Sequence, residues 1–363
     1  LFKIDMSTKA IYRISSLDGL RGISILLVII DHAFKSNFKN LKIGKLGVGI
    51  FFVISSYLII SFLLKDLDSR SFSIRKFYFK RILRIFPAYY FFLAITFGLI
   101  FYLDFFNFEH FWRPLVFLEN YHPASLWKNN WLIGHTWSLA AEEQFYIIIS
   151  ILFLIFKNKN TPRKGLLVSF LSMFILASLF RGGYMIFDNI PVYFKGSVYR
   201  SFETVMDSFA IGGLIALFTI EKLKNHIVIS YFRNKIFLLI ILIFFLQFLN
   251  SPFIREIFGL KVRFIYNTIG LPVIYIVIGV LLVLSVSAQR NTFLYKVLNS
   301  KVLSFIGLIS YSLYLWQQVW LYNWEIPLIV KLLGIFISAL VSYYLIERPS
   351  LKFRNKLLLK YKG

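Results

Sequence analysis

The chain of 363 residues is 58% hydrophobic and 19% aromatic, only 16% of its residues are charged, and it contains no cysteine. Since a globular chain carries about 25% charged residues, this composition excludes a soluble domain, a disordered chain and a disulfide scaffold. The net charge of +24 does not indicate a nucleic-acid partner, because the basic residues lie between apolar runs and can face anionic membrane lipids. We predict an integral membrane protein with no metal site and no thiolate nucleophile.

Ten apolar runs follow one another along the chain, each long enough, or nearly long enough, to cross a bilayer as a helix. They fall at about 20–36, 46–64, 86–103, 137–156, 165–180, 207–220, 236–250, 264–287, 302–321 and 328–346. Several runs have about 15 residues, fewer than the roughly 20 of a full crossing, so their boundaries are approximate. The pattern predicts an all-α integral membrane protein with about ten transmembrane helices.

The distribution of Lys and Arg predicts the orientation of the chain. With ten crossings both termini lie on one side, and roughly two thirds of the 41 lysines and arginines fall on that side. Cytoplasmic loops are the more basic ones, so we predict that both termini are cytoplasmic. The first outward connection is an exception, because Lys35, Lys39, Lys42 and Lys45 all lie in it. These lysines either form a solvated loop or contact an anionic acceptor.

The first run carries ionisable residues, which are costly inside a membrane and therefore candidates for function. Arg21 and His32 are separated by almost three helical turns. Both thus lie on one face, about 20° apart around the axis and roughly 16 Å apart along it. Asp31 lies about 100° from His32 and cannot orient it from within the same helix. His32 is either a catalytic group or a polar residue at the outer end of a span.

Three cations lie together at the start of the third run. Arg81 and Arg84 share a helix face at i,i+3, and Lys80 lies beside Arg84 at i,i+4. No carboxylate lies within one turn of them in the sequence. Guanidinium groups bind phosphate bidentately, so the cluster suits a polyphosphate such as that of coenzyme A. The alternative is ordinary basic flanking of a span.

Two adjacent acids, Glu142 and Glu143, begin the run that enters from the outer side. A helix N-terminus favours carboxylates through its dipole, which is one explanation for the pair. The other is that one acid lies in a polar cavity, where it orients a base or holds a sugar hydroxyl. Neighbouring helical residues point about 100° apart, so only one of the two can do so.

Taken in order, five segments make the chain resemble the membrane acyltransferase-3 family, bacterial enzymes that acylate surface glycans. The segments are LDGLRG with a histidine eleven residues past the arginine, FFVISSYLI, KRILRIFPAYY, TWSLAAEEQFY, and ISYSLYLW with a late ERP. The resemblance runs from Leu17 to about Pro349. It divides the chain into a cytoplasmic segment at 1–16, a membrane domain at 17–349 and a basic cytoplasmic tail at 350–363. It resembles the stand-alone form, without the extracytoplasmic hydrolase-like domain of many relatives.

The resemblance implies a multi-pass protein of the bacterial cytoplasmic (inner) membrane that binds no permanent cofactor. The donor would be acetyl-CoA, and the acceptor a hydroxyl of a lipid-linked or surface glycan such as lipopolysaccharide O-antigen. His32 and Arg21 match the family's catalytic motif, and Glu142 and Glu143 match its acidic pair. Lys80, Arg81 and Arg84 match the cations that this family is expected to use to bind the donor.

Two positions depart from the family pattern. Ser56 stands where glycine is usual, which we expect to tighten a helix contact. Gln317 and Val319 replace a histidine and a proline. Gln317 can donate and accept hydrogen bonds but cannot act as a base, so His32 carries the predicted chemistry. The late Glu347 and Arg348 are expected to end the last span as a salt bridge.

These residues predict an O-acetyltransferase in which acetyl-CoA docks from the cytoplasm and His32 either deprotonates the acceptor or first takes the acetyl group. Arg21 or Ser24 would stabilise an oxyanion, although Arg21 is too distant on the helix to share one carbonyl with His32. The main alternative is a transporter or flippase of a glycan or lipid precursor, in which the same polar residues line a path. A non-catalytic scaffold would leave these residues unexplained.

Overall fold

The computed structural model describes residues 15–34, 42–104, 108–121, 132–187, 199–322 and 324–360. These residues form helices and contain no strand. The long helices are α1 Ser15–Ala33, α3 Ile43–Asp68, α4 Ile74–Tyr102, α6 Trp137–Phe156, α7 Pro162–Ile186, α9 Phe202–Phe218, α12 Ile236–Leu249, α13 Pro252–Ile265, α14 Leu271–Val286, α17 Ser310–Leu321, α18 Leu328–Ser342 and α19 Arg348–Lys360. Shorter elements are α5 Phe108–Leu115, α10 Ile220–Leu223, α11 Ile227–Phe232, α15 Phe293–Leu298, α16 Lys301–Leu308, the 3₁₀ turns η1 Glu119–Tyr121 and η3 Gly134–Thr136, and the π-helical turns η5 Tyr266–Gly270 and η6 Tyr343–Glu347.

The predicted all-α membrane class is confirmed. In the described part of the chain, six helices are long and apolar enough to cross a membrane, or seven if α16 and α17, bent by 73°, make one broken span. The other three predicted runs lie on α1, which carries several charges, on the 17-residue α9 and on the 14-residue α12. Ten crossings and cytoplasmic termini therefore stay predictions.

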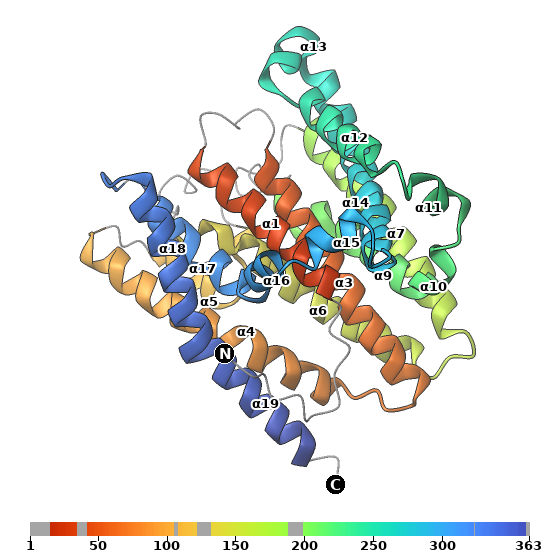
Figure 1. The fold of residues 1–363 in the computed structure, drawn as a ribbon, viewed down its shortest axis with the longest axis horizontal. Helices are drawn as coiled ribbons and strands as arrows, with labels where there is room; N and C mark the ends of the chain where they lie inside the picture. The colour runs from red at the N-terminus through yellow and green to blue at the C-terminus, as the bar shows by residue number, and fades with distance from the viewer. Residues whose placement is uncertain are drawn as a thin grey trace.

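Helix α1 runs through the middle of the bundle, between α3 and α16 (Figure 1). Its neighbours come close because glycines leave room for backbone. A Cβ at Gly19 would lie 2.0 Å from the carbonyl oxygen of Leu298, and one at Gly307 would lie 1.8 Å from that of Asp18. The glycines of the first motif thus have a packing role, since Gly19 and Gly22 let α1 lie close to α15 and α16.

The departure at Ser56 also lies at a close helix contact. Ser56 is buried on α3, and its hydroxyl donates to the carbonyl oxygen of Phe209 on α9. A Cβ at Gly212 on α9 would in turn approach the Val53 carbonyl of α3 to 2.3 Å. The serine therefore ties these two helices together, as the sequence predicted.

Residues near the C-terminus form a helix. Helix α19 continues from η6 and packs along α4 (Figure 1). Ser350 donates a hydrogen bond to the Leu83 carbonyl, which attaches α19 beside the predicted cation cluster. Residues 1–14 and 361–363, which belong to the predicted N-terminal segment and tail, lie outside the described residues.

Candidate active site

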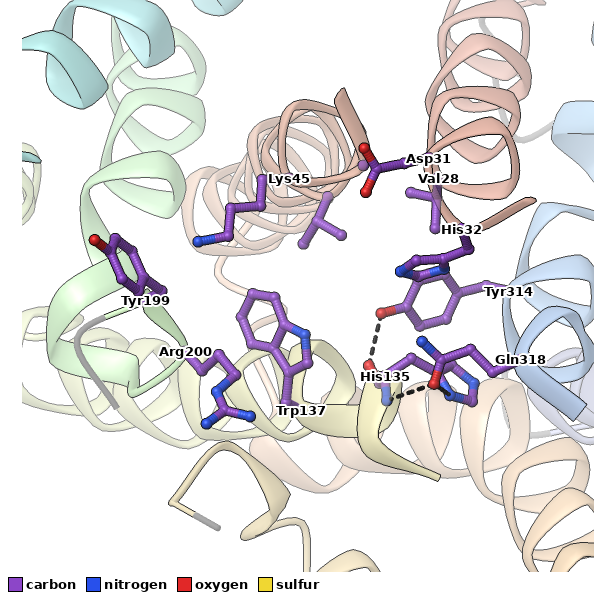
Figure 2. Close-up of a pocket in the computed structure, with 12 residues that line it drawn as sticks. Val28, Asp31, His32, Lys45, His135, Trp137, Tyr199, Arg200, Tyr314 and Gln318 are labelled. Atoms are coloured by element: carbon purple, nitrogen blue, oxygen red, sulfur yellow. Dashed lines mark hydrogen bonds between the residues drawn. The ribbon is translucent and has the colours of Figure 1, made fainter. Parts of the chain in front are cut away.

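A cavity of about 340 Å³ lies between α1, α3, α6 and α17. This volume is near the lower end of the range for ligand pockets, roughly 300–1,000 Å³. It is lined by Val28, Asp31, His32, Gly44, Lys45, Val48, His135, Trp137, Tyr199, Arg200, Tyr314 and Gln318 (Figure 2). We call it the histidine pocket. It contains His32 of the sequence-predicted site, and most of its other polar residues were not predicted.

Gln317 positions His32 in this pocket. The Nδ1 atom of His32 lies 2.7 Å from Oε1 of Gln317, which is fully buried on α17. An amide oxygen only accepts, so this hydrogen bond places a proton on Nδ1 and leaves the lone pair of a neutral ring on Nε2. The residue that departs from the family pattern thus orients the predicted base. Sequence reasoning missed the pair because the two residues lie 285 positions apart.

A second histidine, His135, lies in the η3 turn and also lines the pocket. Its Nδ1 lies 3.1 Å from Oε1 of Gln318, and its Nε2 lies 3.0 Å from the carbonyl oxygen of Leu315. The hydroxyl of Tyr314 donates to the His135 carbonyl at 2.7 Å (Figure 2). Both ring nitrogens are held by neighbouring atoms, which favours a structural role for His135 and leaves the chemistry with His32. The only signal in the sequence was its place directly before the TWSLAAEEQFY segment.

The predicted cations lie away from this pocket, nearer the other end of α1. We call Arg21, Arg81, Arg84 and Arg354 the arginine cluster, because electrostatic interactions connect all four. The guanidinium of Arg81 also lies over the ring of Tyr146, 5.5 Å from its centroid. Arg354 comes from α19 and was not predicted.

The carboxylates missing from the local sequence around these cations come from other helices. Asp66 interacts electrostatically with Lys80, which also interacts with Arg81. Asp18 forms an ion pair with Arg21 at 3.4 Å, one turn away on α1. The predicted cations therefore do form a spatial group. Its charge is partly balanced by Asp18, which is close to Arg21 in the sequence, and by Asp66, which the fold brings to Lys80.

The acidic pair interacts with the arginine cluster and does not line the histidine pocket. Glu142 accepts hydrogen bonds from the hydroxyls of Ser55 and Tyr146, and it interacts electrostatically with Arg21. Glu143 has a buried carboxylate oxygen with no hydrogen-bond partner among the described residues, and it interacts electrostatically with Arg81. Neither acid is among the residues lining the histidine pocket, where Gln317 rather than a carboxylate orients the base. Their catalytic role stays a prediction.

Two details of the predicted chemistry are wrong. Glu347 does not form a salt bridge with Arg348 in the described part of the chain; it is buried, accepts from Ser312 at 3.0 Å and interacts with Arg84. The π-helical turn η6, where Glu347 lies, directs it inward. Ser24 is no oxyanion donor, because its buried hydroxyl donates to the Gly47 carbonyl and holds α1 against α3.

Helix α17 connects the two regions. Near its start Ser312 binds the Glu347 carboxylate, and near its end Gln317 and Gln318 bind the two histidines. Helix α1 makes the same connection, since it is continuous from Arg21 to His32. The roughly 16 Å separation predicted from helix geometry therefore stands. The site consists of two polar regions joined by two helices.

Comparison with known proteins assigns a family to this arrangement. A family model described as an acyltransferase domain matches residues 14–347. The chain belongs to the acyltransferase-3 family. The resemblance carried by the five sequence segments is confirmed, and the match covers the histidine pocket and the arginine cluster except for Arg354.

Two curated relatives carry the name O-acetyltransferase. The chain is 27% identical to the O-acetyltransferase OatA of Staphylococcus aureus strain NCTC 8325, over 92% of this chain and 56% of that protein. It is 30% identical to SACOL0978 of S. aureus strain COL, provisionally named an O-acetyltransferase, over 93% of this chain and 57% of that protein. The chain thus spans little more than half the length of these relatives. No solved structure matches it.

Proposed function

We propose that this protein is a membrane O-acetyltransferase that moves an acetyl group from acetyl-CoA to a sugar hydroxyl of lipopolysaccharide O-antigen or a related surface polysaccharide. The observation that carries the proposal is His32, held by Gln317 in a ligand-sized cavity, on the same helix as Arg21 of the arginine cluster. The acyltransferase family model and the named O-acetyltransferases support it. The setting we propose is the bacterial inner membrane, crossed about ten times, with both termini cytoplasmic.

The donor would dock at the arginine cluster. Arg81 and Arg84, with Lys80 beside them, offer charge-assisted hydrogen bonds to the phosphates of acetyl-CoA. Their half-buried side chains remain partly accessible, as a binding site for a soluble donor requires. The acids around them hold the guanidinium groups in place before the donor arrives. In this proposal Arg21 contacts the donor at the inner end of α1, while Glu142 and Glu143 lie between the donor and the acceptor.

The acceptor would react in the histidine pocket. Nε2 of His32 takes the proton of the sugar hydroxyl while its oxygen attacks the acetyl carbonyl carbon. The C–S bond of the thioester then breaks, and CoA leaves as a thiol once it receives that proton. Alternatively, Nε2 attacks the thioester carbonyl carbon, the C–S bond breaks and CoA leaves as a thiolate. The sugar oxygen then attacks the acetyl group, the N–C bond breaks, and the freed Nε2 takes the hydroxyl proton, which later reaches the CoA thiolate. This relay accommodates the distance between the two regions.

The test is mass spectrometry of surface polysaccharide from four matched strains: native, gene deletion, His32→Ala and the control His226→Asn. His226 is an exposed residue that caps α11, and asparagine can also act as an N-cap. We expect an added acetyl group, about 42 Da, in the native and His226→Asn strains alone, since a lost general base or nucleophile costs roughly 10²- to 10⁴-fold in rate. Unmodified polymer in all four strains contradicts acetylation of that polymer. Absence of polymer from the surface of the deletion strain favours a transporter.

A further inference from the structure

A group of cations surrounds Tyr199 at the edge of the histidine pocket. The ammonium of Lys45 lies 3.7 Å from the centroid of the Tyr199 ring, and that of Lys42 lies 5.7 Å from it. The guanidinium of Arg263 lies 5.7 Å from the same centroid and donates to the Tyr199 hydroxyl at 2.9 Å. Three cations from two distant parts of the sequence thus converge on one aromatic ring.

Further cations add to this group and outnumber the acids near it, because the acids that interact with its members are Asp31 and, at Arg200, the buried Glu119. Lys42 interacts electrostatically with Arg255, and Lys45 with Arg200. The acid that interacts with both lysines is Asp31, and neither lysine forms a salt bridge with any carboxylate in the described part of the chain. Burial and the nearby arginines lower the pKa of Lys42 to about 8. Positive charges held this close repel one another, and an anion bound between them would favour their charged forms.

Lys45 brings this charge into the cavity that contains His32. Its side chain points from α3 across the pocket toward Tyr199 and remains exposed there (Figure 2). Tyr199, Arg200, Lys45 and His32 all line the same cavity of about 340 Å³. A ligand that presents a hydroxyl to His32 in this cavity can therefore reach the cations as well. Of the outward lysines in the sequence prediction, Lys42 and Lys45 belong to this group, while Lys35 and Lys39 lie outside the described residues.

We propose that the acceptor is anionic, and that the cations around Tyr199 bind a carboxylate or phosphate that it carries next to the acetylated hydroxyl. This inference rests on the proposed function, because it assigns the pocket to the acceptor. The arginine cluster near the other end of α1 would meet the donor's phosphates, so the donor does not account for this second set of cations. Tyr199 holds the cations in place, and its ring supplies a flat surface against which a sugar packs.

The experiment measures acceptor binding without acetyl-CoA. Surface polysaccharide is purified from the deletion strain, so that it is unmodified, and titrated into the full-length protein in detergent. One portion is first reduced with carbodiimide and borohydride, which converts carboxylates to alcohols. Another is treated with hydrofluoric acid, which removes phosphate esters. The proteins compared are wild type, Lys45→Gln, Arg263→Gln and the control Lys261→Gln, an exposed lysine on the same helix as Arg263.

We expect one treatment to raise the Kd of the polymer for wild type about tenfold, the effect of losing one charge-assisted hydrogen bond. Reduction identifies a carboxylate as the bound group, and hydrofluoric acid identifies a phosphate. Lys45→Gln and Arg263→Gln should each raise the Kd of the untreated polymer by a similar factor and reduce the effect of the treatment. Lys261→Gln should leave the Kd unchanged.

Three results overturn the inference: no measurable binding of the untreated polymer, equal binding of treated and untreated polymer, or no effect of either substitution in the cation group. Arg263→Gln provides a second variant if Lys45→Gln does not fold. A different result would contradict the proposed function without contradicting the anionic subsite. Charge-dependent binding without acetyl transfer on adding acetyl-CoA leaves the anionic subsite standing and removes the enzyme assignment.

Discussion

The two polar regions of the molecule have similar cations but different surroundings. In the arginine cluster, carboxylates from several helices reach the cations, with Glu142 near Arg21, Glu143 near Arg81 and Glu347 near Arg84. In the histidine pocket the cations converge on the Tyr199 ring, where Asp31 interacts with both lysines and Glu119 interacts with Arg200. One region has most of its charge compensated by the protein, and the other leaves a positive surplus for a ligand.

This difference indicates how each region treats an anion. Carboxylates around arginines fix the guanidinium geometry, so an incoming phosphate meets preorganised donors but a smaller net charge. A surplus of positive charge attracts an anion more strongly and less selectively. The arginine cluster is thus suited to one defined donor, and the histidine pocket to the charged part of a more variable acceptor.

The largest effect on activity should come from removing the hydrogen bond between Gln317 and His32. Gln317→Leu removes the acceptor at Nδ1 of His32 and should lower kcat about 10- to 100-fold, by analogy with the loss of partners that orient metal-ligating histidines. The KM values and thermal stability should change little, because the buried Gln317 amide nitrogen has no partner among the described residues. An acetyl-transfer assay with purified protein measures kcat and both KM values.

Two further variants serve as controls. Gln317→Glu, which keeps an acceptor oxygen, should retain more activity than Gln317→Leu, and the exposed Gln289→Leu should match wild type. An unchanged kcat in Gln317→Leu contradicts the positioning role.

Removing a charge should destabilise the fold more in the arginine cluster than in the histidine pocket, because the cluster's charges are largely paired within the protein. Glu347→Ala deletes a buried carboxylate that accepts from Ser312 and interacts with Arg84. We expect it to destabilise the fold by about 2 kcal/mol, since hydrogen bonds to charged groups contribute about 1.5–3 kcal/mol. Thermal unfolding in detergent measures the change, with the exposed Glu325→Ala as the matched control. Equal melting of both variants would show that Glu347 does not hold the cluster together.

The donor assignment predicts an effect that depends on the donor's phosphates. Arg84→Gln should raise KM for acetyl-CoA about tenfold, because one charge-assisted hydrogen bond is lost. With acetyl-pantetheine, which lacks the phosphates, Arg84→Gln and wild type should have the same KM. The exposed Arg290→Gln serves as the control. A loss of the same size with both donors would assign Arg84 a structural role.

The smallest effect should follow from removing Asp31, the acid that interacts with both lysines of the pocket. Asp31→Asn preserves the shape of a side chain that packs against Gly44 while it deletes the charge. We expect the KM of an acidic acceptor to fall about two- to threefold, as expected for removing one like charge at a solvated site. The KM for acetyl-CoA should not change. A fall in the KM of a neutral, carboxyl-reduced acceptor as well would contradict an electrostatic cause.

Much of the molecule followed from local patterns in the sequence. The apolar runs determined an all-α membrane protein, because a backbone in lipid must satisfy its own hydrogen bonds within helices. The period of the α-helix fixed the separation of Arg21 and His32 and the shared face of Arg81 and Arg84. The ordered motifs predicted the family, which the family model confirms. Each of these conclusions depends on residues close together in the chain.

The tertiary structure decided which groups meet across the chain. Gln317 reaches His32 from 285 positions away, and Ser312 binds Glu347 rather than leaving it to the adjacent Arg348. Nothing in the local sequence linked Tyr199 with Lys45. Helix periodicity determines which way a side chain faces, but only the close packing of helices, permitted here by glycines such as Gly19 and Gly307, decides what it faces. The charge balance that distinguishes the two regions is a consequence of that packing.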